Sequence, residues 1–197
     1  PRHVRCVFVT QAEALGLGHA VSCARPVIGD EPFAVLLPDD LIWSKGRGAI
    51  GQMIDLSEQQ NASVISVQEV PHEQTSSYGI VSAPSFTGRF GSIEQIVEKP
   101  KPEQAPSNLA VVGRYVLSPD IFPILDKTRS GKGGEIQLTD AIAQLLVQHK
   151  VLAYQFEGRR FDCGSRIGLV EATIEFALEH DDLAEATRAY MREALAR

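Results

Sequence analysis

Hydrophobic residues in the first half of the chain alternate between strand-like and helix-like spacing. The short β-branched and aromatic run from Arg5 to Val9 predicts a strand, and a helix to about Arg25 follows it. Phe33 to Leu37 is apolar at every position, which predicts a strand buried on both faces of a parallel sheet. A helical stripe over Ile50 to Ser57 leads to a further strand at Ala62 to Val70. Strand, helix and strand at these spacings indicate an α/β fold.

The middle of the chain shows a different pattern. Tyr78 to Ser82, Ser92 to Val97 and Leu109 to Leu117 are short strand-like stretches separated by turn residues, with no helix between them. Such stretches predict an antiparallel or mixed extension of the sheet.

The final third is mostly helical, with one strand at Val151 to Phe156. Apolar residues recur at helical spacing over residues 138–146, 167–178 and 183–195. Repeats and low-complexity linkers are absent from the sequence. We therefore expect one α/β domain over residues 1–165, followed over residues 166–197 by C-terminal helices that pack on it or serve oligomerisation.

Composition and charge exclude several classes of protein. The 197 residues are 44% hydrophobic and 22% charged, as in a packed soluble protein rather than a disordered one. A formal net charge of -6, without long runs of lysine or arginine, argues against a nucleic-acid partner but leaves room for a free nucleotide. The apolar runs are too short to cross a membrane. Three cysteines without a C-x-x-C pair favour reduced thiols, and so a cytoplasmic protein.

Three aspartates follow predicted strands. Asp39 and Asp40 come directly after the apolar run that ends at Leu37 and Pro38. Ligands of open parallel sheets bind at the carboxyl ends of strands, and carboxylates there suit Mg²⁺. Asp162 repeats the arrangement late in the chain, so two carboxylates could share one metal. The alternative readings are that Pro-Asp-Asp is a turn whose aspartates cap local backbone, and that Asp162 or Ser165 caps the next helix.

An adjacent acid and base, Glu98 and Lys99, end another predicted strand. Neighbouring residues of a strand point to opposite faces unless the chain bends, and Pro100 makes a bend plausible. A carboxylate suits sugar hydroxyls, and an ammonium suits a phosphate. The alternative reading is a solvated Glu-Lys-Pro-Lys edge.

Gln11, Gly16 and Gly18 lie between the first predicted strand and the first predicted helix. Glycines at such a junction let the backbone approach a ligand closely, and a glutamine amide pairs with a base edge. The spacing matches neither the GxGxxG fingerprint nor a phosphate loop. Ser130 to Gly134 also lacks phosphate-loop spacing, and we expect a flexible loop there. We expect His19 to pack at a helix start.

Six strings of the sequence together resemble those of bacterial UTP–glucose-1-phosphate uridylyltransferases. They are QAEALGLGHAV (Gln11 to Val21), GDEPFAVLLPDD (Gly29 to Asp40), TSSYGIV (Thr75 to Val81), VEKPKPEQAPSNLAVVGRYVLSPDIF (Val97 to Phe122), GGEIQLTDAI (Gly133 to Ile142) and FDCG (Phe161 to Gly164). Their order and spacing match from the first strand to the last helix. The long fourth string and GGEIQLTD separate this family from its thymidylyl and adenylyl relatives.

The resemblance implies a Rossmann-like sugar-nucleotidyltransferase fold with a mixed sheet and a C-terminal helical tail. It also implies Mg²⁺ as cofactor, a homo-oligomer, and the reaction of UTP with glucose 1-phosphate to give UDP-glucose and pyrophosphate. In that reaction a phosphate oxygen of glucose 1-phosphate attacks the α-phosphorus of UTP in line, without a covalent enzyme intermediate.

The motif matches also imply residue roles. Gln11 would read uracil beside the backbone of Gly16 and Gly18. Asp39, rather than Asp40, would hold Mg²⁺ together with Asp162. Glucose would be lined by three residues, Tyr78, Gly79 and Val111. Glu98 would bind the sugar hydroxyls and Lys99 the phosphate, which makes Lys99 and Asp39 the catalytic pair.

The family opens with a strand and a glycine-rich loop whose arginine and lysine grip the triphosphate, and no stretch of this chain matches that opening. We therefore expect residues 1–165 to be an incomplete, N-terminally truncated nucleotidyltransferase domain. We also expect this chain alone to show no turnover in a pyrophosphate-release assay with UTP, glucose 1-phosphate and Mg²⁺; robust activity would refute this.

Two other functions remain open from the sequence. A glycosyltransferase that uses Pro-Asp-Asp as its metal motif would release a nucleoside diphosphate from a UDP-sugar. A non-catalytic oligomerisation or regulatory remnant would bind no nucleotide and would use the apolar faces near Ile174 and Met191 to contact a partner.

Overall fold

The computed structural model describes residues 3–197, apart from the side chain of Lys132. The chain divides into two structural units. Unit 1 runs up to Val35 and resumes over Ile50–Phe156, and unit 2 comprises Leu36–Ala49 with Glu157–Arg197. The predicted boundary after residue 165 stays a prediction. Among residues 3–197, no helix combines the length and the apolar character needed to cross a bilayer.

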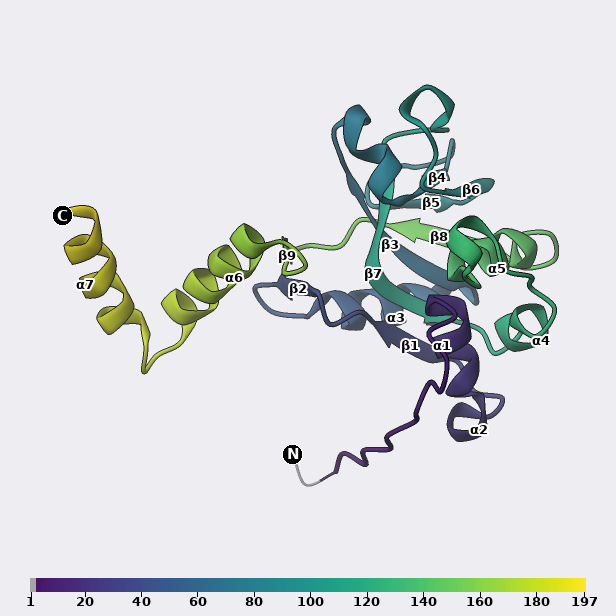
Figure 1. Ribbon diagram of the computed structural model, residues 1–197, viewed down its shortest axis with the longest axis horizontal. Helices are drawn as coiled ribbons and strands as arrows, with labels where there is room; N and C mark the ends of the chain where they lie inside the picture. Colours follow the sequence, from purple (N-terminus) through teal and green to yellow (C-terminus); the bar gives the residue numbers. More distant parts are fainter. Residues whose placement is uncertain (1–2) are drawn as a thin grey trace. The chain divides into compact units, whose positions relative to one another are not determined.

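The secondary-structure elements follow in chain order (Figure 1). They are α1 (Leu17–Cys23), α2 (Arg25–Ile28), β1 (Phe33–Leu36), β2 (Asp40–Trp43), α3 (Ala49–Gln60), β3 (Ser63–Glu69), the 3₁₀ helix η1 (His72–Ser77), β4 (Gly79–Ser82), β5 (Phe90–Ser92), β6 (Gln95–Glu98), η2 (Pro102–Gln104), β7 (Leu109–Leu117), α4 (Ile121–Leu125), η3 (Lys132–Gly134), α5 (Leu138–Leu145), β8 (Val151–Tyr154), β9 (Arg159–Asp162), α6 (Arg166–Glu179) and α7 (Ala184–Leu195).

A mixed sheet of seven strands organises unit 1. Its order is β5-β8-β3-β7-β4-β6, and β1 also pairs with β7. The β3–β8 pair is parallel, whereas β3–β7, β4–β7, β4–β6 and β5–β8 are antiparallel. The predicted mixed α/β architecture is therefore confirmed. The long strand β7 is buried along nearly its whole length, although Gly113 and Arg114 interrupt its apolar residues.

The core of unit 1 forms on both faces of this sheet. Met53 and Leu56 of α3 pack against Val64, Val116 and Leu152 of three neighbouring strands, which confirms the predicted helical stripe. Side chains alternate along a strand, so the intervening strand residues point to the other face. The helices α1, α4 and α5 pack on one another (Figure 1) and supply further buried side chains. These are Val21, Ile121, Phe122, Leu125, Leu138, Ala141, Ile142 and Leu145.

Two predictions about strands are wrong. Arg5 to Val9 forms coil, and Phe8 is 95% exposed. A strand requires hydrogen bonds from a partner, and β-branched composition alone supplies none. Of the predicted range Phe33 to Leu37, Phe33–Leu36 forms β1, but its side chains are alternately half-buried and exposed, with Leu36 55% exposed. In the part of the chain described, β1 pairs with β7; this pairing occupies an edge of the strand, whereas burial of its faces depends on the side chains packed above and below it.

Unit 2 consists of the antiparallel pair β2–β9 and the helices α6 and α7. Phe161 of β9 lies 6.2 Å from Phe176 of α6 between ring centroids, and the Arg159 guanidinium lies 4.7 Å from the Phe161 ring centroid. The two C-terminal helices form as predicted. None of the large apolar residues of their stripes is buried, however: these are half-buried or exposed, and the buried residues of α6 are the small ones, Gly168 and Ala172.

Candidate functional site

The backbone bends sharply where β6 ends, at Glu98 and Lys99. Lys99 has a φ of 44°, in the left-handed region that non-glycine residues rarely adopt. Its N–H donates to the carbonyl of Tyr78 at 2.9 Å, and its Nζ lies 3.6 Å from Glu98 Oε1. The acid and the base therefore lie together instead of on opposite faces. Such a conformation costs about 1–3 kcal/mol and is typical of functional sites.

Gly79 lies directly opposite Glu98 in the β4–β6 register. A β-carbon at Gly79 would lie 3.4 Å from Glu98 Oε2, and the Glu98 side chain is 12% exposed. Val111 is buried on β7, which pairs with β4 through Ala110 and Ile80. The predicted sugar-lining residues thus belong to the adjacent strands β6, β4 and β7, with Tyr78 directly before β4. Their contact with a sugar stays a prediction.

Gln11 and the two glycines form a second group in unit 1. The Gln11 amide donates to the Gly16 carbonyl at 3.0 Å and also contacts His19 Nδ1 at 3.0 Å. Gly18 donates its N–H to the Ile136 carbonyl at 2.8 Å, and Gly16 has a φ of 100°. The backbone of these glycines therefore packs closely against the loop before α5, whereas the sequence predicted a close approach to a ligand. The predicted role of this group in binding uracil is not tested by these contacts.

Replacing Gly18 by alanine tests this packing. The added β-carbon would lie 2.7 Å from the Ile136 carbonyl oxygen, so the backbone must shift. We expect a loss of about 1–3 kcal/mol in the free energy of unfolding, measured by urea denaturation. Gly48→Ala is the matched control, because nothing lies within 4 Å of its β-carbon. Equal stability of the two variants would contradict the close packing at Gly18.

Asp39 and Asp162 meet in unit 2 through the β2–β9 pair. Asp162 ends β9 opposite Asp40, and the Cys163 N–H donates to the Asp39 carbonyl at 2.7 Å. A β-carbon at Gly164 would lie 3.1 Å from Asp162 Oδ1 and 3.8 Å from Asp39 Oδ2. The two carboxylates therefore flank one point, as predicted. The predicted route differs, because a separate two-stranded sheet, not two strand ends of the main sheet, brings them together.

Asp40 and Ser165 have structural roles beside this pair. Asp40 is 5% exposed and forms an ion pair with Arg160. Ser165 caps α6 by accepting a hydrogen bond from the Gly168 N–H at 3.0 Å. The helix cap is therefore Ser165, while Asp162 Oδ1 accepts from the Gly164 N–H at 3.1 Å. The sequence analysis did not predict the Arg160–Asp40 pair. The signal that could have indicated it is an arginine inside a short strand.

The carboxylate oxygens of Asp39 and Asp162 are suitable ligands for Mg²⁺. This ion takes one or two carboxylates and completes its shell with water and substrate phosphates. Among the described residues, no cluster of three or more His, Cys, Asp or Glu side chains is placed to hold a metal. Two carboxylates leave coordination positions open for water and phosphate, and they do not form the closed coordination shell of a structural metal site.

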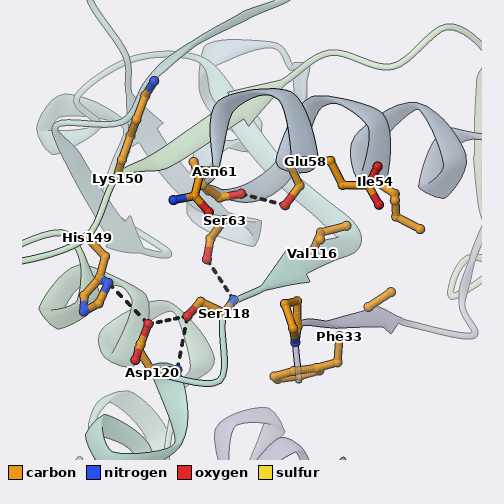
Figure 2. Close-up of a pocket in the computed structure, with 14 residues that line it drawn as sticks. Phe33, Ile54, Glu58, Asn61, Ser63, Val116, Ser118, Asp120, His149 and Lys150 are labelled. Carbon is orange, nitrogen blue, oxygen red and sulfur yellow. Dashed lines mark hydrogen bonds and ion pairs between the residues drawn. The ribbon is translucent and has the colours of Figure 1, made fainter. Parts of the chain in front are cut away.

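Unit 1 also contains a cavity of about 570 Å³ beside β1 and α3 (Figure 2). Its lining includes Phe33, Ile54 and His149, but none of the predicted site residues. His149 Nδ1 lies 3.4 Å from the Asp120 carboxylate, which also contacts the Ser118 hydroxyl. These polar groups therefore pair with one another, and the cavity is separate from the predicted sites in the same unit.

Comparison with known proteins places the chain in a family. A sequence model described as "Nucleotidyl transferase" matches residues 2–179. The UTP–glucose-1-phosphate uridylyltransferase of Pseudomonas aeruginosa is 50% identical over 167 residues, which are 84% of this chain and 60% of that protein. The chain thus spans about three fifths of that relative's length.

Solved structures agree with the fold. A UTP-bound UGPase from Acinetobacter baumannii matches with a TM-score of 0.88 at 41% identity, over 97% of this chain and 66% of that one. A UDP-glucose pyrophosphorylase complexed with UDP-glucose matches with a TM-score of 0.80 at 40% identity, over 95% of this chain and 66% of that one. The family match covers most of the chain, and the observed Rossmann-like mixed fold agrees with it. The chain belongs to the nucleotidyl transferase family.

Proposed function

We propose that this chain carries residues for uridylyl transfer from UTP to glucose 1-phosphate, giving UDP-glucose and pyrophosphate. The observation that supports this most is the bend at Lys99, which sets an ammonium beside a carboxylate opposite a glycine. The relatives and solved structures described above support the choice of uridine and glucose.

The groups of unit 1 have the chemistry that a sugar phosphate requires. The Lys99 ammonium would hold the phosphate of glucose 1-phosphate as a point charge, and the Glu98 carboxylate would accept hydrogen bonds from sugar hydroxyls. Gly79, opposite Glu98, carries no side chain that would compete with the ring for the space beside the carboxylate. In the transfer, a phosphate oxygen of glucose 1-phosphate bonds to the α-phosphorus of UTP, and the bond to the pyrophosphate leaving group breaks. Lys99 would fix the attacking phosphate in position.

In unit 2, Asp39 and Asp162 would hold Mg²⁺ between their carboxylates. When bound, the ion would offset the negative charge of the phosphates. Asp40 would not contribute, because it is buried against Arg160.

We also place the protein in the cytoplasm and expect it to form a homo-oligomer. All three cysteines are free thiols, as the reducing cytosol favours. Ile167, Val170 and Tyr190 expose large apolar side chains on α6 and α7, which are suited to contact a second copy.

Calorimetric titration with UDP-glucose tests the proposed function. We expect saturable binding of one UDP-glucose per chain, and weaker binding of ADP-glucose. Transfer of glucose from UDP-glucose to an acceptor, with release of UDP, would instead indicate the glycosyltransferase. Failure to bind any nucleotide would indicate the non-catalytic module.

A further inference from the structure

Two aspartates lie directly opposite each other in the β2–β9 pair of unit 2. Asp40 is the register partner of Asp162, and Ile42 is the register partner of Arg160. Opposite residues of an antiparallel pair share a face, and side chains alternate along each strand. Asp40, Arg160 and Asp162 therefore lie on one face of this small sheet. Like charges directly opposite each other destabilise a strand pair, so this face requires a counter-charge.

Arg160 supplies that counter-charge along the diagonal of the register. Its guanidinium forms an ion pair with the Asp40 carboxylate, and the two side chains are only 12% and 7% exposed. Two positions along the neighbouring strand is within reach of a long side chain. A buried charge has to be paired, so removing either partner leaves a strongly unfavourable group behind. The pair therefore forms where β2 and β9 have the observed register.

The same register brings the metal-binding carboxylates together. Asp39 directly precedes β2, Asp162 ends β9, and the Cys163 N–H donates to the Asp39 carbonyl at 2.7 Å. A slip of one residue turns every side chain of a strand to the opposite face, so it would break the diagonal ion pair. It would also move Asp162 away from its place beside Asp39. Buried polar groups fix the register in other paired elements, even where they add little stability.

We infer that Arg160 is a positioning residue for the metal pair, because its ion pair with Asp40 sets the strand register that brings the Asp39 and Asp162 carboxylates together. Arg160 would not bind the ion, since its guanidinium carries a charge of the same sign. This inference rests on the metal site of the proposed function.

The charge of Arg160 by itself would act on metal binding in the opposite direction. A guanidinium near two carboxylate ligands repels a divalent cation, so electrostatics alone predicts tighter Mn²⁺ binding when Arg160 becomes neutral. Loss of the strand register predicts weaker binding. The sign of the change in Mn²⁺ affinity therefore separates a positioning role from a simple effect of charge.

The test measures Mn²⁺ affinity of the 197-residue chain by electron paramagnetic resonance. We expect Arg160→Met to weaken Mn²⁺ binding at least about tenfold, as loss of a residue that orients metal ligands does. Arg160→Lys keeps the charge without the fork of the guanidinium and should lose less. Arg159→Met is the matched control, because Arg159 precedes Arg160 on β9 but pairs with Glu175 of α6, and it should leave the affinity unchanged.

A double variant separates positioning from stability. Arg160→Met alone leaves the Asp40 carboxylate buried without this partner, and unit 2 could unfold for that reason. Asp40→Leu combined with Arg160→Met removes one charge of each sign, and an apolar pair is often as stable as the ion pair that it replaces. We expect this variant to unfold at about the temperature of the unsubstituted chain, while its Mn²⁺ affinity stays about tenfold lower.

Full Mn²⁺ affinity in the double variant would show that the ion pair serves stability alone and would overturn the inference. Unchanged or tighter Mn²⁺ binding by Arg160→Met would overturn it as well, while the metal site of the proposed function stands. If the unsubstituted chain binds no Mn²⁺, that metal site and the inference fall together.

Discussion

Lys99→Met is expected to weaken binding of UDP-glucose by about ten- to hundredfold. Methionine keeps the length of the side chain but removes the charge, and a hydrogen bond to a charged group contributes about 1.5–3 kcal/mol. The Lys99 side chain is 47% exposed and its pair with Glu98 is 3.6 Å long, and exposed ion pairs of this kind contribute little to stability. Calorimetric titration with UDP-glucose measures the change in affinity.

Lys101→Met is the control for this substitution. Lys101 belongs to the same Glu-Lys-Pro-Lys string but is an exposed residue before η2. If the string is only a solvated edge, both substitutions will have the same small effect. Equal affinities of the two variants for UDP-glucose would thus show that Lys99 does not bind the phosphate.

Substitution of both Asp39 and Asp162 by asparagine is expected to abolish measurable binding of a divalent cation. Each single substitution should weaken binding at least about tenfold, because hard cations depend on the charge of their oxygen ligands. Asparagine keeps a side-chain oxygen, so at position 162 it still accepts the Gly164 N–H and the local turn survives. Titration with Mn²⁺, followed by electron paramagnetic resonance, reports the affinity directly.

Asp181→Asn removes an exposed acid from the same unit and should leave Mn²⁺ binding unchanged. The account of the metal pair would be wrong if the double variant bound Mn²⁺ as tightly as this control. Circular dichroism should show the same helix content for the two single variants, the double variant and the Asp181→Asn control, since neither Asp39 nor Asp162 caps a helix.

The sequence was most informative where one strong local pattern decided the structure. The helical period over residues 138–146 predicted the buried face of α5, and the stripe over Ile50 to Ser57 predicted that of α3. In both helices the controlling residues lie within a few positions of one another, so the information is local. Pro100 made a bend after β6 plausible, but a residue before proline favours extended backbone, so the positive φ of Lys99 did not follow from it.

The misses concern partners that lie far apart in the sequence. The pairing of β2 with β9 joins Asp40 to Asp162 across more than a hundred residues, and no local pattern encodes that register. The exposure of Leu36 and of Phe8 likewise depends on which strands lie beside them.

Amide mapping by nuclear magnetic resonance would show whether unit 1 binds the sugar phosphate at the β4–β6 bend. UDP-glucose should shift the amide signals of Gly79, Glu98 and Lys99 and leave those of His149 and Lys150 unchanged. Shifts confined to His149, Lys150 and the cavity beside β1, or no shifts at all, would contradict the account.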